Sequence, residues 1–149
     1  MIKKMAIWVL CLSVLFIQFS IAEEKFLSLK KSKVNVRYGP SFDSKIKYIY
    51  KKINLPIKQI DQKENFRRIV DLKNNSGWIH VSQVKKSNSI IILENKILYK
   101  KPSNFSKPIA KLEKGRLLVI NKCEEGWCNI TTSKYTGWVK IKNIWGSAK

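Results

Sequence analysis

The sequence predicts an all-β protein made of two small barrels in tandem, preceded by an N-terminal signal peptide. Three observations lead to this fold class: an apolar run near the N-terminus, an internal repeat, and short β-branched or aromatic runs separated by turn residues. The chain has 149 residues, of which 44% are hydrophobic, enough for one ordinary domain or two very small ones. So short a chain leaves little room for a catalytic cleft, and we expect a binding module.

The first element is an apolar segment at the N-terminus. Two lysines precede an apolar run over residues 6–17, and the small residues Ser20 and Ala22 follow it. This order is typical of a secretory signal peptide that is cleaved after Ala22, and the run is short for a membrane-spanning helix. A retained N-terminal anchor is the alternative. We predict that residues 1–22 are a signal peptide and that the protein is exported, to the periplasm or another extracytoplasmic compartment.

The rest of the chain consists of two copies of one unit. Trp78 and Trp138 each follow a glycine and are 60 residues apart, while Phe66 and Trp127 match at an offset of 61. Short insertions in loops produce such a drift, and each copy has the size of a small independent domain. The predicted boundaries are residues 23–87 for unit 1 and residues 88–149 for unit 2.

Each unit contains short runs of strand-forming residues with turn signals between them. In unit 1 the expected strands lie at residues 34–38, 46–50, 57–60, around 69 and at 78–81; in unit 2 they lie at 90–93, 97–99, 117–120, around 130 and at 138–141. Gly115 and Asn54 occupy the same turn in the two copies, where we expect a positive φ. Pro56 should stand at a strand start or edge, because proline cannot donate a ladder hydrogen bond. Strands at this spacing predict a small all-β barrel in each unit.

Two cysteines, Cys123 and Cys128, remain once the signal peptide is removed. An even pair in an exported chain is typical of a disulfide. A hairpin that turns at Glu125 and Gly126 would place the two opposite each other, and so small a loop contributes about 2 kcal/mol to stability. Free thiols are the alternative if the chain is not exported. We expect no metal site, because two thiolates alone cannot fill a tetrahedral shell.

The chain is strongly basic. Its 30 Lys and Arg against 10 Asp and Glu give a formal charge of +20, which becomes +18 (28 minus 10) without the two lysines of the signal peptide. Residues 25–87 hold 16 basic and 4 acidic side chains, and residues 88–149 hold 12 and 4. A dedicated polyanion site is usually clustered on one face, so this spread favours solvated surfaces. The alternative is attraction to anionic envelope polymers or lipid head groups; export argues against nucleic acid as the partner.

An ordered set of short motifs runs through both units. Unit 1 has VNVRYGP at residues 34–40, LPI at 55–57, FRRI at 66–69 and GWIH at 77–80; unit 2 has CEEGWC at 123–128, YTGW at 135–138 and IWG at 144–146. In this order they resemble the bacterial SH3-like (SH3b) family, and an exported subfamily with two such units. Phe66 stands where the family usually has Trp, and Asn54 where it usually has Gly. The resemblance implies a five-stranded SH3-like barrel in each unit, a non-enzymatic role in the cell envelope, and binding of peptidoglycan or its peptides, as in many relatives.

The candidate catalytic residues favour structural roles. His80 and the cysteines lie in different units, so a Cys–His nucleophilic pair is disfavoured, and we expect His80 to be a structural hydrogen-bonding residue. The acidic residues that could act in glycoside cleavage stand in predicted loops among lysines, where solvated roles are favoured; they are Asp43, Asp61, Glu64 and Asp71. No Gly-rich phosphate loop occurs. We expect a protein that is not an enzyme and has no cofactor.

Aromatic side chains are the candidate ligand-binding residues. Trp78 and Trp138 are expected to fill the barrel cores. Other rings border the long loop of such a barrel or begin the strand after a hairpin, where they could stack on sugars or contact an extended peptide. These candidates are Tyr38, Phe42, Phe66, Tyr99, Phe105 and Trp127. The alternatives to peptidoglycan binding are a protein-protein adaptor that docks by its barrel edges and a salt-sensitive binder of anionic envelope polymers; the sequence leaves the oligomeric state open.

Overall fold

The structure is a computed structural model, and it describes residues 23–148. Residues 1–22, the predicted signal peptide, lie outside the described residues. Unit 1 contains β1 (Lys25–Leu29), β2 (Val34–Arg37), β3 (Ile46–Tyr50), β4 (Pro56–Lys63), β5 (Phe66–Val70), β6 (Ser76–His80), the 3-10 helix η1 (Val81–Gln83) and β7 (Val84–Lys86). Unit 2 contains β8 (Ser89–Ile92), β9 (Lys96–Tyr99), β10 (Pro108–Leu112), β11 (Leu117–Glu124), β12 (Trp127–Thr131), β13 (Thr136–Lys140) and β14 (Ile144–Gly146). Among the described residues, no helix is long and apolar enough to span a membrane.

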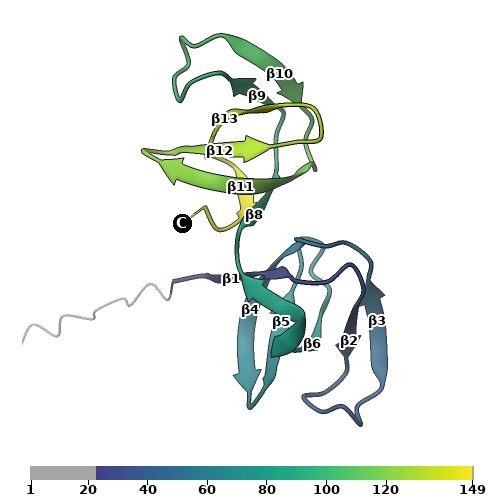
Figure 1. Cartoon of the computed structure of the whole chain (residues 1–149). Coiled ribbons are helices and arrows are strands. Elements are labelled where there is room, and N and C mark those ends of the chain that lie inside the picture. The colour runs from purple at the N-terminus through teal and green to yellow at the C-terminus, as the bar shows by residue number, and fades with distance from the viewer. Residues whose placement is uncertain (1–22, 149) are drawn as a thin grey trace, which may run out of the picture.

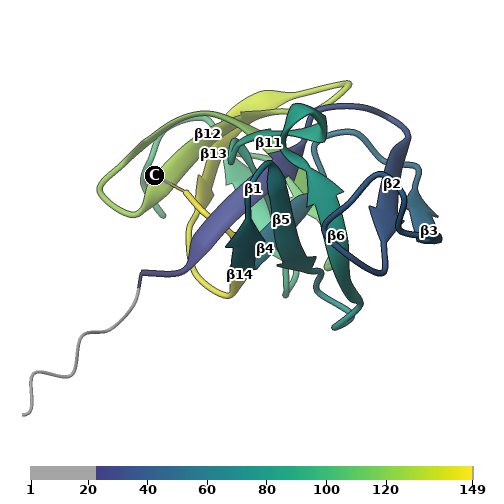
Figure 2. The same cartoon turned by 90° about the horizontal axis from the view of Figure 1, so that it is seen from below.

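Each unit forms one antiparallel sheet of seven strands that curls around its own core (Figures 1 and 2). The strand order is β3-β2-β6-β5-β4-β1-β7 in unit 1 and β10-β9-β13-β12-β11-β8-β14 in unit 2. These orders are the same when strands are matched by their place in each unit, so the structure confirms the two tandem all-β barrels. There are seven strands instead of five because the first and last strands of each unit pair with each other beside the central ones.

The turns that the sequence predicts are present. Gly115 has φ 86° and Asn54 has φ 61°, and Pro56 is the first residue of β4. Glu125 (φ 46°) and Gly126 (φ 80°) form the turn of the β11–β12 hairpin. Two consecutive residues with positive φ match the right-handed twist of the flanking strands, which explains the tight connection.

The hairpin places Cys123 directly opposite Cys128, with a Cα–Cα distance of 4.0 Å, and the two form the predicted disulfide. Cys128 is fully buried in the core of unit 2. The disulfide therefore joins the exposed end of the hairpin to that core.

Aliphatic side chains fill both cores. The buried cluster of unit 1 comprises Leu29, Val34, Val36, Ile57, Ile69 and Ile79; that of unit 2 comprises Ile90, Ile92, Leu98, Leu112, Leu118, Cys128, Ile130 and Val139. The prediction that Trp78 and Trp138 fill the cores is wrong for Trp78, which is only half-buried. Trp138 is buried, as predicted, although it lies outside the aliphatic cluster of unit 2. Neighbouring side chains on a strand point to opposite faces, and the inward positions are occupied by Ile79 and Val139.

Buried hydroxyl groups connect the two units. Ser28 Oγ of β1 lies 2.7 Å from Ser89 Oγ of β8, and both residues are fully buried. Ser89 donates its proton to the Asn54 carbonyl (2.5 Å), so Ser28 must donate to Ser89. Ser28 in turn accepts from the Asn88 N–H (3.3 Å). The result is a continuous chain of hydrogen bonds that crosses the junction.

A tryptophan on the last strand adds a second connection. Trp145 of β14 donates its indole N–H to the Pro56 carbonyl of unit 1 (3.0 Å). Its ring also meets Phe26 of β1 edge-on, with 5.2 Å between ring centroids. The short linker therefore joins two units that are packed directly against each other (Figure 1).

Candidate ligand-binding site

The outer face of strands β5, β6 and β2 carries several aromatic and basic side chains of unit 1. In the strand register Phe66 lies opposite His80, and Trp78 lies between Arg68 and Arg37. These residues alternate with core residues along their strands, so they share the outward face.

Phe42, Phe66 and His80 form a contiguous set of rings, here called the unit-1 aromatic cluster. Phe42 comes from the β2–β3 loop; its ring centroid lies 5.2 Å from that of Phe66 and 4.8 Å from that of His80. Phe66 is buried, whereas Phe42 is 64% exposed. Arg37 fixes the loop from the other side, since its Nη1 donates to the carbonyls of Phe42 (3.0 Å) and Ser44 (2.8 Å). The cluster therefore presents one exposed ring on a buried support.

His80 has the structural role that the sequence predicts, together with a place in the cluster. Its Nδ1 lies 2.8 Å from the Ser82 hydroxyl and accepts from the Ser82 N–H (3.3 Å) at the start of η1. This hydrogen bond assigns the ring proton to Nε2 if the imidazole is neutral. The ring thus has a fixed orientation against Phe42.

Unit 2 has a smaller counterpart, here called the unit-2 aromatic pair. Tyr99 and Trp127 meet edge-on with 5.7 Å between ring centroids, and Trp127 is buried. Asn104 occupies the loop position that Phe42 has in unit 1. A hollow of about 200 Å³ beside the pair is lined by Tyr99, Asn104 and Lys140, among others. At this loop position unit 2 therefore has a polar side chain where unit 1 has an aromatic ring.

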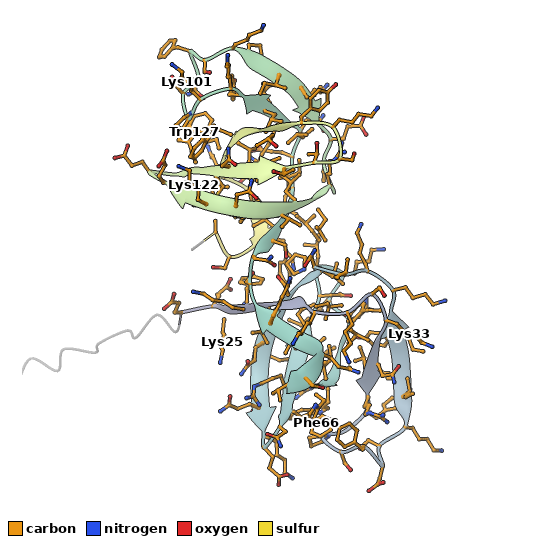
Figure 3. The ribbon with its side chains drawn as sticks, viewed as in Figure 1. Lys25, Lys33, Phe66, Lys101, Lys122 and Trp127 are labelled. Atoms are coloured by element: carbon orange, nitrogen blue, oxygen red, sulfur yellow. A yellow bond between two sulfur atoms is a disulfide. The ribbon has the colours of Figure 1, made fainter. Side chains whose placement is uncertain are left out.

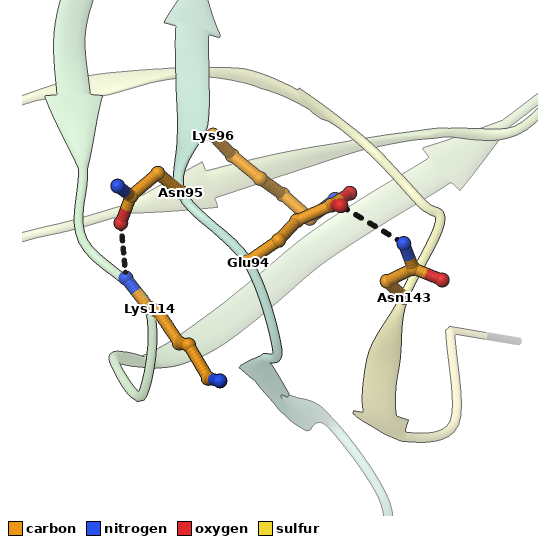
Figure 4. Close-up of polar contacts among 5 residues, drawn as sticks. All are labelled: Glu94, Asn95, Lys96, Lys114 and Asn143. Atoms are coloured by element: carbon orange, nitrogen blue, oxygen red, sulfur yellow. Dashed lines mark hydrogen bonds and ion pairs between the residues drawn. The ribbon is translucent and has the colours of Figure 1, made fainter.

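A polar cluster lies at the rim of that hollow (Figure 4). Lys96, on β9, is 8% exposed; its Nζ contacts Glu94 Oε1 at 2.8 Å, and Glu94 Oε2 accepts from Asn143 (2.8 Å). Hydrogen bonds from Lys96 first, and from Asn143 second, hold the pKa of the Glu94 carboxyl below its usual value. The charge of Lys96 is therefore matched within the protein.

The structure brings together some of the predicted site residues and separates others. Phe42 meets Phe66, and Tyr99 meets Trp127. Phe105 is fully exposed in the β9–β10 loop, and Tyr38 lies apart from the unit-1 aromatic cluster. Figure 3 shows Phe66 at the end of unit 1 remote from unit 2, and Trp127 well separated from it. Four of the six candidates therefore form two separate ring contacts, one in each unit, and the six do not line one groove.

Asp61 and Asp71, two of the acidic candidates, have different surroundings in the structure. Asp61 lies in strand β4, which corrects its predicted loop position. Asp71 accepts from the Tyr50 hydroxyl (3.0 Å) and from the N–H groups of Lys73 and Asn75, so it fixes the turn after β5. Within residues 23–148, no three or more His, Cys, Asp or Glu residues gather in a way that could hold a metal ion.

The family model described as the bacterial SH3 domain matches residues 30–86 and again residues 94–146. The chain belongs to the bacterial SH3 domain family. The two matches fall on the two barrels, so each unit is one SH3 domain.

Two solved structures show a distant similarity to the chain. NlpC2 and NlpC1 from Trichomonas vaginalis each show 12% sequence identity and a TM-score of 0.38. The alignments cover 83% and 86% of this chain but 48% of each of those chains, so this protein spans about half of their length. No curated protein matches the chain.

Proposed function

We propose that this SH3-domain protein is a non-enzymatic, exported component of the bacterial cell envelope that binds peptidoglycan, or the peptides of peptidoglycan. Membership of the bacterial SH3 domain family is compatible with a cell-wall role. The observation that carries the proposal is the unit-1 aromatic cluster, in which Phe42 is 64% exposed while Phe66 and His80 support it from below. A ring in this position can stack on a sugar or contact the apolar part of a peptide without losing much conformational entropy on binding.

Co-sedimentation with purified wall sacculi tests this proposal. The chain from residue 23 onward should pellet with sacculi at physiological salt, and Phe42→Ala should reduce the bound fraction about tenfold, as expected for a loss of about 1.4 kcal/mol. Phe105→Ala is the matched control, because Phe105 is also an exposed loop phenylalanine and lies outside both aromatic sites. The proposal is wrong if the protein does not pellet, or if both variants bind like the wild type.

One observation favours the adaptor function as a second candidate. Strand β3 ends its sheet, and Ile46 and Ile49 on it are 46% and 39% exposed. An edge strand with exposed aliphatic side chains can pair with a strand from a partner protein. Affinity capture from envelope extracts should then return one stoichiometric protein that is lost with Ile49→Lys; an empty capture counts against this function.

A further inference from the structure

A small basic pocket lies beside the unit-1 aromatic cluster. It has a volume of about 120 Å³ and is lined by Arg37, Tyr38, Lys47, Arg68 and Trp78, among others. Arg68 and Trp78 form the pair next to Phe66 and His80 on the same face of the sheet. Arg37 connects the pocket with the aromatic cluster, because its guanidinium lines the pocket and lies 5.7 Å from the centroid of the exposed Phe42 ring.

Two of the three cations are fixed in place by the protein. The Nη1 atom of Arg37 makes the two loop hydrogen bonds described above. Lys47 Nζ donates to the Ser76 carbonyl (2.8 Å) and lies 5.6 Å from the centroid of the Tyr38 ring. A guanidinium has five N–H donors and an ammonium three, so both groups keep donors for a ligand.

The positive charge of the pocket is not neutralised by the protein. The ion pairs among residues 23–148 that involve lysine use Lys58, Lys96 and Lys122, and no carboxylate there lies within ion-pair distance of the three cations of the pocket. Asp61 lies opposite Arg68 in the strand register, but its Oδ1 accepts the Gln62 N–H (2.7 Å) and it forms no ion pair with Arg68. Arg68 is exposed, and its guanidinium donates no hydrogen bond within the described part of the chain.

Unit 2 lacks these cations at the equivalent positions. In the strand registers of unit 2, Tyr99 stands at the position that Arg37 has in unit 1. Ile109 stands at the position of Lys47, and Asn129 at the position of Arg68. Ile109 packs against the core, and the ring of Trp138 is approached by Lys122 Nζ at 5.2 Å. The arrangement of three cations is therefore a property of unit 1 and not of the fold that both units share.

We propose that this pocket binds one oxyanion group, a carboxylate or a phosphate, on a ligand whose neighbouring apolar part rests on Phe42. Guanidinium groups bind such planar or tetrahedral anions with charge-assisted hydrogen bonds. A volume of about 120 Å³ accommodates one small group and not a polymer chain. This inference deepens the proposed function by naming the chemistry of the ligand, and it rests on that function only for the source of the anion.

Titration with small anions, followed by heteronuclear NMR of the chain from residue 23 onward, tests the site. The indole N–H of Trp78 reports on the pocket, and that of Trp138 is the internal control in unit 2. N-acetyl-alanine and methyl phosphate represent the two sources, and N-acetyl-alaninamide is the neutral analogue. We expect a saturable shift at Trp78 with at least one anion, which identifies the preferred group, and none with the amide.

Matched variants separate the pocket from general electrostatics. Arg68→Gln should weaken anion binding about tenfold, as expected for the loss of a hydrogen bond to a charged group. Lys31→Gln makes the same change of charge at an exposed lysine outside the pocket and should leave binding unchanged. Equal shifts at Trp78 and Trp138, equal effects of the two variants, or no saturable shift with either anion would overturn the inference.

The outcome also distinguishes this inference from the proposed function. If the anions bind at Trp78 but sacculi do not pellet the protein, the site stands and peptidoglycan binding fails. If sacculi pellet the wild type and Arg68→Gln equally and no anion shifts Trp78, peptidoglycan binding stands and the oxyanion site fails.

Discussion

Replacing Ser89 with alanine removes the central link in the hydrogen-bond chain between the two SH3 domains. The substitution leaves the Asn54 carbonyl without its donor and the Ser28 hydroxyl without its acceptor, at a fully buried position. An unsatisfied buried polar group costs about 1–3 kcal/mol, so Ser89→Ala should lower the free energy of unfolding by about 3 kcal/mol. Ser28→Ala should cost about 1.5 kcal/mol, because Ser89 keeps its bond to Asn54 while the Asn88 N–H loses its acceptor.

The double variant measures the coupling between the two hydroxyl groups. Once Ser89 is alanine, Ser28→Ala no longer breaks the bond between the two hydroxyl groups and only removes the acceptor of the Asn88 N–H, so it should cost less than it does in the wild type. The double variant should therefore be less destabilised than the sum of the two single effects. Urea denaturation of the wild type, both single variants and the double variant gives the four free energies. Ser133→Ala, at an exposed serine, is the control and should stay within about 0.5 kcal/mol of the wild type. Single effects that simply add, or a loss below about 1 kcal/mol for Ser89→Ala, would refute this reasoning.

Three further predictions concern individual residues. Reduction of the Cys123–Cys128 disulfide should lower the free energy of unfolding by about 2 kcal/mol, measured by urea denaturation with and without a phosphine; an unchanged midpoint after full reduction would contradict it. Gly137→Ala should cost about 1–3 kcal/mol, because a Cβ there would lie 2.7 Å from the Tyr99 carbonyl oxygen; an unchanged melting temperature would contradict this. Burial is the main cause that raises the pKa of the Tyr50 hydroxyl, so the unfolded state releases this proton first and stability falls as the pH rises above about 10. Tyr50→Phe should reduce that fall in urea denaturation between pH 8 and pH 11; an equally steep loss in the variant would show that other groups cause it.

The repeat and the turns could be read from the sequence because they depend on local chemistry. Asn54, Gly115 and Gly126 have the positive φ that their residue types favour, whereas the positive φ of Glu125 is not indicated by its residue type. Strand β10 (Pro108–Leu112) was not predicted, because it begins with a proline and has only weak alternation. It exists through pairing with β9, a contact that no local pattern encodes.

The face of the Trp78 strand was assigned wrongly for a physical reason. A large ring favours burial, but strand geometry permits either face. In unit 1 the inward position before Ile79 is Gly77, where an added Cβ would lie 2.4 Å from Val36 Cγ1. Space inside the barrel is limited there, and Trp78 lies on the outer face, where it lines the basic pocket.

The candidate site could be predicted residue by residue but not as an arrangement. Phe42 and Phe66 were both candidates, yet their contact depends on the path of the β2–β3 loop. An offset of 61 residues pairs Tyr38 with Tyr99, whereas the strand register pairs Arg37 with Tyr99. Tyr38 follows the last residue of β2, and its ring lies beside Lys47 in the basic pocket, apart from the unit-1 aromatic cluster.

The separation of Phe66 from Trp127 (Figure 3) has a consequence for the way in which the protein would act on its target. A single short ligand cannot reach both places, whereas a polymer with repeated binding groups can. Because the two domains are connected by direct contacts, the second contact with such a polymer would be intramolecular and would be favoured by a high effective concentration. Two modest sites would then give avidity for an assembled wall while leaving small soluble fragments weakly bound.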